Sequence, residues 1–215
     1  MIHQLLLSSI PLIDFFLTKT LGKTSRWFQL HAVVNIMIMF LVIPDTLEIL
    51  IRPSLPLPPQ SPTVDMALTL VGGCHMYHFA IETLTPLEIW HHVLFVAMGI
   101  PALYYFQSQI IALILFTGCG FPGALEYTML SLVKHNRIRS ITQKRVNSWI
   151  NNYIRGPIGI YSATIAYVDI PSSPLVYYIC FLIYLNATFF SKMAVENHMW
   201  HHCTLRDRYS GEEFP

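Results

Sequence analysis

Histidine is the residue type whose number and spacing most suggest chemistry in this sequence. The chain has ten histidines among 215 residues, and several of them occur close together. The close sets are His75 with His78, His91 with His92, and an HxxHH motif made by His198, His201 and His202. An imidazole exchanges a proton near neutral pH and also binds transition metals. These histidines are therefore candidates for a general base or for metal ligands.

The elements that must position these histidines are membrane helices. The chain is 53% hydrophobic and 12% charged, whereas soluble domains carry about a quarter charged residues. Apolar runs without charge recur along nearly its whole length, which predicts an all-α, polytopic membrane helix bundle with about seven transmembrane helices. The expected spans cover residues 3–18, 27–44, 64–81, 86–106, 110–133, 156–170 and 174–198.

Three parts are expected along the chain. Residues 1–24 form a short N-terminal membrane helix and linker, residues 25–202 form the main membrane domain, and residues 203–215 form a polar cytosolic tail. The sequence leaves open whether residues 1–18 cross the membrane fully, because Asp14 interrupts that run. The four cysteines have no metal-ligand spacing and are expected to be small core residues.

Three connecting segments carry helix-breaking signals. Five prolines between Arg52 and Pro62 predict an extended loop. Residues 140–155 begin with a capping-box pattern at Ser140 and predict a short amphipathic helix at the membrane interface, ended by Gly156-Pro157. The glycine-rich stretch 118–123 predicts a kink or a close helix contact within the fifth span.

Lysine and arginine placement predicts the orientation. With seven spans, eleven basic residues fall on one side of the membrane and Arg52 alone falls on the other. The positive-inside rule therefore places the C-terminus in the cytosol. Nine of the ten histidines then lie in the cytosolic half of the membrane, and only His3 lies elsewhere. The basic residues on the cytosolic side are Lys19, Lys23, Arg26, Lys134, Arg137, Arg139, Lys144, Arg145, Arg155, Arg206 and Arg208.

Helix geometry predicts which of these side chains can cooperate. His75 and His78 share one helix face, and the short turn 82–85 folds them back toward His91 and His92. Adjacent helical residues diverge by about 100°, so only one of the pair is expected to face His78. We take His91 and His92 as catalytic candidates. The lipid-binding candidates are His31, Asn35, His75, His78 and Glu126.

Plainer roles are available for several of these residues. A histidine near a membrane interface can be an ordinary amphipathic side chain, and this applies most to His31 and His135. Thr85-Pro86-Leu87-Glu88 is a capping box, so Glu88 is expected to cap a helix rather than to act as an acid. Lys192 and Glu196 are four residues apart and are expected to pair with each other.

Three of these motifs resemble the TLC-domain family, which includes the ceramide synthases and translocon-associated membrane proteins. They are Ser25-Arg26-Trp27-Phe28-Gln29-Leu30-His31, His75-Met76-Tyr77-His78 and Trp90-His91-His92. The likeness covers roughly residues 27–196 and implies a TLC-like fold that handles lipid. In ceramide synthases, an adjacent histidine pair serves acyl transfer from acyl-CoA to a sphingoid amine, and His91 and His92 resemble that pair. However, residues 93–115 contain no aspartate or glutamate, unlike those enzymes.

The expected function is therefore lipid binding or handling without the acyltransferase activity of ceramide synthases. One alternative is a lipid-modifying enzyme that uses the His91/His92 pair, and another is an integral subunit of a larger membrane complex. A di-iron lipid hydroxylase would use His198, His201 and His202, but the chain has no second HxxHH motif. No cofactor is expected. Expected partners are membrane lipids, acyl-CoA or a sphingoid lipid, and other membrane subunits, but not nucleic acid. The expected location is the endoplasmic reticulum or another endomembrane.

Overall fold

The computed structural model describes the backbone of residues 1–51 and 55–210, with side chains to residue 204. Part of the proline-rich loop, including Arg52 and Pro53, lies outside the described residues, as do residues 211–215 of the expected tail and the side chains of Arg206 and Arg208. Within the described chain, every regular element is helical, and the single β-bridge joins Pro59 to Ser108. The all-helical expectation is therefore confirmed for this part of the chain.

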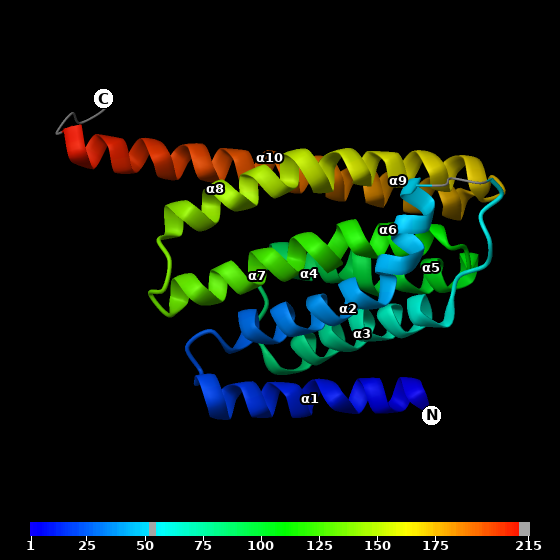
Figure 1. Ribbon diagram of the computed structural model, residues 1–215, viewed down its shortest axis with the longest axis horizontal. Helices are drawn as coiled ribbons and strands as arrows, with labels where there is room; N and C mark the ends of the chain where they lie inside the picture. The colour runs from blue at the N-terminus through cyan, green and yellow to red at the C-terminus, as the bar shows by residue number, and fades with distance from the viewer. Residues whose placement is uncertain (52–54, 211–215) are drawn as a thin grey trace.

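Ten α-helices and three π-helical segments, η1 to η3, make up the bundle (Figure 1). Their bounds are α1 Ile2–Leu21, α2 Arg26–Ile51, α3 Pro62–Ile81, α4 Pro86–His91, η1 His92–Gly99, α5 Ile100–Phe106, α6 Ile110–Leu115, η2 Phe116–Gly120, α7 Phe121–Lys134, α8 Ser140–Ile150, η3 Asn151–Arg155, α9 Gly156–Asp169 and α10 Pro174–Ser210.

Five helical stretches of the described chain are long and apolar enough to cross a membrane, by length and composition. This agrees with a multi-pass membrane protein, although seven spans were expected. The remaining two expected spans correspond to α3 and to α9, which run alongside the others (Figure 1). The five stretches cover Ile2–Leu21, Arg26–Ile51, Pro86–Phe106, Ile110–Lys134 and Pro174–Thr204.

The bundle places its connections at two opposite ends. The α1–α2, α3–α4 and α7–α8 connections and the end of α10 lie together at one end, and the N-terminus lies at the other (Figure 1). Lys19, Lys23, Lys134, Arg137 and Arg139 belong to the first end, because they flank the α1–α2 and α7–α8 connections. We call this the basic end of the bundle. The α2 helix is central and packs against α1, α3, α6 and α7.

A buried ion pair fastens α1 to its neighbours. The Asp14 carboxylate is 2% exposed and accepts a hydrogen bond from Arg26 Nε at 2.8 Å. It accepts a second from the Tyr77 hydroxyl at 2.7 Å. A charge inside an apolar bundle requires such partners. Asp14 therefore does not end the helix but ties α1 to α2 and α3.

The helix end expected at Gly156-Pro157 is wrong, whereas the close helix contact expected within 118–123 is present, since a Cβ atom on Gly120 would lie 3.4 Å from Cα of Met39 on α2. The helix that begins at Ser140 continues to Asp169 through Gly156-Pro157, and the stretch 118–123 also stays helical. In both places the chain forms a π-helical turn and a proline follows two residues later, as also happens at Gly99 and Pro101. Proline lacks an N–H and clashes with the carbonyl of the preceding turn. The wider π turn moves that carbonyl away, so the helix passes the proline without breaking.

The two expected capping boxes have different outcomes. At Thr85, the side chain accepts a hydrogen bond from the Glu88 N–H, and the Glu88 carboxylate accepts one from the Thr85 N–H, which confirms that box. At Ser140 the box is wrong, because the capping position is Arg139, which makes no side-chain cap bond. Glu88 therefore caps the N-terminus of α4, as the sequence predicted.

Candidate functional site

Two adjoining cavities lie inside the bundle. The first, which we call the chamber, has a cavity volume of about 140 Å³, and the second, which we call the vestibule, has one of about 400 Å³. They share part of their wall and therefore adjoin, and we call the two together the joined space. The shared lining includes His75, His91, Gly118, Arg155 and Asn186.

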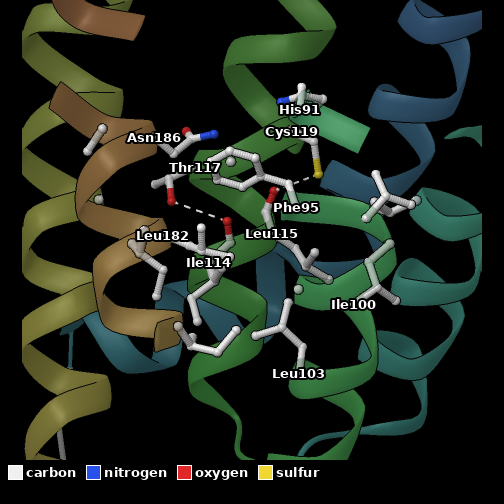
Figure 2. A pocket seen from close by; sticks show the side chains of 18 of the residues that line it. His91, Phe95, Ile100, Leu103, Ile114, Leu115, Thr117, Cys119, Leu182 and Asn186 are labelled. Atoms are coloured by element: carbon white, nitrogen blue, oxygen red, sulfur yellow. Dashed lines mark hydrogen bonds between the residues drawn. The ribbon is translucent and has the colours of Figure 1, made fainter. Parts of the chain in front are cut away.

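The chamber is lined mainly by aliphatic side chains from α5, α6 and α10. Figure 2 shows its polar residues His91 and Asn186 at one end and Leu103 at the other. Removing apolar surface from water lowers the free energy, so this wall favours an apolar occupant. Other members of the wall are Ile100, Ile114, Ile179, Leu182 and Ile183.

The vestibule carries most of the polar groups. His31 and Asn35 of α2 and Glu126 of α7 line it, together with the residues shared with the chamber. Glu88 and Trp90 of α4, at the basic end of the bundle, also belong to its wall. The joined space is therefore polar toward the basic end and apolar deeper in the bundle.

All three π-helical segments reach this space. Phe95 and Gly99 of η1, Thr117 and Gly118 of η2, and Arg155 of η3 line the chamber. In a π turn the backbone bonds shift, and carbonyl groups become available to other donors. The carbonyls of Thr117 and Gly118 each accept a hydrogen bond from the Arg155 guanidinium at 3.3 Å. The π turns thus shape the wall and hold Arg155 in it.

Five histidine side chains lie close together beside the vestibule. The His75 ring centroid is 5.8 Å from that of His31, 5.9 Å from that of His91 and 5.3 Å from that of His92. The His78 ring is 5.2 Å from His92 and 5.7 Å from His31. The short hairpin between α3 and α4 brings His75 and His78 toward His91 and His92, and the packing of α2 against α3 adds His31.

The adjacent histidines point in different directions, as their helical spacing predicts. His92 is buried against α3, and its Nδ1 donates a hydrogen bond to the Glu88 carbonyl at 2.7 Å. His91 instead lies near Phe190 of α10, with ring centroids 6.2 Å apart, and lines both cavities. Only His91 of the pair is therefore placed to touch an occupant.

One histidine at the cavity has a defined tautomer. The carbonyl of Val71 can only accept, so Nδ1 of His75, 2.8 Å away, carries the proton. Its Nε2 is then the free basic nitrogen, and His75 lines both cavities. A neutral imidazole of this kind can take a proton from a hydroxyl or an amine.

The predicted site residues thus fall into two groups. His31, Asn35, His75, His91 and Glu126 line the joined space. His78 and His92 do not line it but lie behind His75, and the His78 ring packs on Trp27 with centroids 3.5 Å apart.

The HxxHH motif is separate from the site. His198, His201 and His202 lie on the C-terminal part of α10 and line neither cavity. The rings of His198 and His202 are 6.3 Å apart. Among side chains that the structure describes, no three His, Cys, Asp or Glu residues are arranged to hold a metal ion. The geometry gives the di-iron hypothesis no support.

Sequence reasoning missed Arg155, Asn186 and Gly118 as site residues. The sequence places Arg155 with the cytosolic basic residues between the fifth and sixth expected spans, because the interfacial helix is expected to end at Gly156. The sequence feature that could have indicated its burial is its position ten residues after Arg145, where the segment becomes apolar. Comparison with protein-family models, curated proteins and solved structures found no match to this chain.

Proposed function

We propose that this protein is a TLC-like multi-pass membrane protein that binds a lipid in the joined cavities. The acyl chain occupies the chamber, and the head group lies in the vestibule. The observation that carries this proposal is an apolar chamber that shares its wall with a second cavity in which most of the polar side chains lie. Small-molecule sites typically have a mostly apolar lining with a few polar groups, and the chamber fits that description, because its wall is mainly aliphatic and includes His91, Arg155 and Asn186.

The polar side of this space argues for a head group at the cytosolic surface. The vestibule lies toward the basic end of the bundle, where Lys19, Lys23 and Lys134 flank the connections. Under the positive-inside rule this end faces the cytosol. We therefore place the C-terminus in the cytosol and the protein in the endoplasmic reticulum or another endomembrane.

Lipid analysis of the purified protein tests this function. The protein is extracted in a mild detergent, delipidated on a column, incubated with a mixed lipid extract and analysed by native mass spectrometry. We expect one lipid to stay bound per chain. The Gly118→Leu variant, which fills the wall shared by the two cavities, is expected to retain less. If the parent protein and this variant retain equally little lipid, the proposed function is wrong.

A second candidate function is a lipid-modifying enzyme, and the position of His75 and His91 favours it. Both line the joined space, with ring centroids 5.9 Å apart, and His75 presents a free Nε2. Such a nitrogen could act as a general base on a bound hydroxyl or amine.

Quantitative lipid mass spectrometry of cells tests the enzyme hypothesis. Cells lacking the protein are complemented with the parent chain, His75→Ala, His91→Ala or His92→Ala. The His92 variant is the matched control, because this neighbouring side chain does not line the space. Catalysis predicts accumulation of a substrate lipid with the first two variants alone. An unchanged lipid profile in all three would leave binding as the function.

A further inference from the structure

We infer that the bound lipid has an anionic head group and that Arg155 binds it. This inference rests on the proposed lipid-binding function and goes one step further, because it assigns the head-group chemistry and a residue for it. The chemical class is an acyl chain that ends in a carboxylate or a phosphate.

Arg155 is a buried cation whose hydrogen-bond partners are all neutral. Its side chain is 7% exposed. Nε donates to the Thr117 carbonyl, Nη2 donates to the Gly118 carbonyl, and Nη1 donates to Asn151 Oδ1 at 2.9 Å. A guanidinium has five N–H donors, so about two remain for another partner. The guanidinium also lies over the Phe190 ring, whose centroid is 5.7 Å from Cζ of Arg155.

No described carboxylate forms a direct ion pair with this guanidinium. The two ion pairs among the described side chains are Asp14 with Arg26 and Lys192 with Glu196. The vestibule contains two carboxylates, and neither bonds directly to Arg155. Glu88 caps its own helix at Thr85, and Glu126 accepts a hydrogen bond from Asn147 at 3.1 Å. Glu126 is linked to the guanidinium through two amides, because Asn151 Nδ2 donates to Asn147 Oδ1 and Asn151 Oδ1 accepts from Arg155 Nη1. A buried charge without a counter-ion is unfavourable, so an anion at Arg155 would be strongly held.

The position of Arg155 connects this charge to the chain-binding space. It lines both cavities, with His91 and Asn186 at the polar end of the chamber. A lipid whose chain fills the chamber would therefore present its head group to the guanidinium. Guanidinium groups match carboxylate and phosphate groups through paired hydrogen bonds. A sphingoid amine is positively charged and would be repelled from the same position.

Competition binding to the unmodified protein tests the head-group charge. A fluorescent acyl-chain probe is displaced by four compounds with matched eighteen-carbon, singly unsaturated chains: oleate, oleoyl lysophosphatidate, oleyl alcohol and oleylamine. The buffer is mildly alkaline, so that the carboxylate is ionised. Acetate and inorganic phosphate serve as free anions. We expect one or both anionic lipids to bind about tenfold or more tightly than the alcohol, oleylamine to bind weakest, and the free anions to displace nothing.

The outcomes separate this inference from the function on which it rests. If the alcohol or the amine binds as tightly as both anionic lipids, the anionic head group is wrong and lipid binding stands. If none of the four lipids displaces the probe and no lipid is retained in the earlier experiment, the proposed function fails. If acetate or phosphate displaces the probe as well as the lipids do, the site takes a free anion, and the inference is also overturned.

Variants of Arg155 test the residue. Arg155→Gln is expected to abolish the difference between oleate and oleyl alcohol, and Arg155→Lys is expected to keep part of it. Arg145→Gln is the control, because Arg145 is exposed on the same continuous helix. A folding defect would weaken both lipids together, so the ratio of the two dissociation constants is the quantity to compare. An unchanged ratio in Arg155→Gln would overturn the assignment.

Discussion

Replacing Gly118 by leucine is expected to obstruct the lipid-binding space while leaving the bundle folded. Gly118 lines both the chamber and the vestibule. A Cβ atom built at this position meets nothing within 4 Å, so a side chain has room to enter the space without a clash. The replacement also removes a glycine from a helical segment, which is expected to stabilise it by about 0.5–1 kcal/mol.

The size of the effect follows from the volume that the new side chain occupies. A leucine side chain has about four carbon atoms and would displace about as many methylene groups of a bound acyl chain. At about 0.8 kcal/mol per buried methylene, this loss is about 3 kcal/mol. Since about 1.4 kcal/mol corresponds to a factor of ten, the dissociation constant should rise by about 100-fold. Gly118→Ala adds one carbon and should raise it by only a few-fold.

Displacement of a fluorescent fatty acid in detergent micelles or nanodiscs measures this constant. The matched control is Gly72→Ala on α3, where a Cβ atom would make ordinary contact with Ile100 at 3.7 Å. Gly72 does not line either cavity. Thermal unfolding of each variant shows whether the fold is kept. The reasoning is refuted if Gly118→Leu unfolds like the parent chain and still binds the probe with the parental affinity.

Three further predictions concern the fold. Asp14→Ala leaves the partly exposed Arg26 without its partner and should lower the free energy of unfolding by about 1–3 kcal/mol in thermal unfolding. The control Lys192→Ala breaks an exposed ion pair and should lower it by less than about 1 kcal/mol. Equal losses in the two variants would contradict the role of Asp14. Gly159→Ala places a Cβ atom 2.7 Å from that of Ala187, so it should destabilise the α9–α10 contact by about 1–3 kcal/mol; an unchanged melting temperature would contradict this close packing. Cys203 is exposed, so its expected place in the core is wrong. A membrane-impermeant maleimide should label it from the cytosolic side, and labelling from the lumenal side alone would reverse the orientation.

The helices and the convergence of the histidines could be predicted from the sequence. Long apolar runs must form helices in a membrane because every backbone polar group needs a partner there. The turn between His78 and His91 is short, so α3 and α4 must lie side by side as an antiparallel hairpin. The Thr85 capping box could also be predicted, because its donors and acceptors lie within four residues of one another in the sequence.

The cavity could not be predicted because it depends on contacts between distant segments. At Pro157 a π turn replaces the expected helix end, because a glycine followed by proline ordinarily marks a turn. Similar π turns precede Pro101 and Pro122. Continuation of the helix through Pro157 moves Arg155 from an interface to the wall of the chamber. Likewise, His91 and His92 are equivalent in the sequence, and the packing of α10 decides that His91 alone faces the space.

Photo-crosslinking with a fatty acid that carries a diazirine at the end of its chain tests lipid binding in the joined space most directly. The labelled peptides are identified by mass spectrometry after the probe is activated in the membrane. We expect labels on the apolar wall of the chamber, around Leu103, Ile179 and Leu182, and expect Gly118→Leu to remove them. Labels confined to the exposed side of α10, such as Phe181 and Tyr184, with none in the chamber, would contradict the proposed binding site.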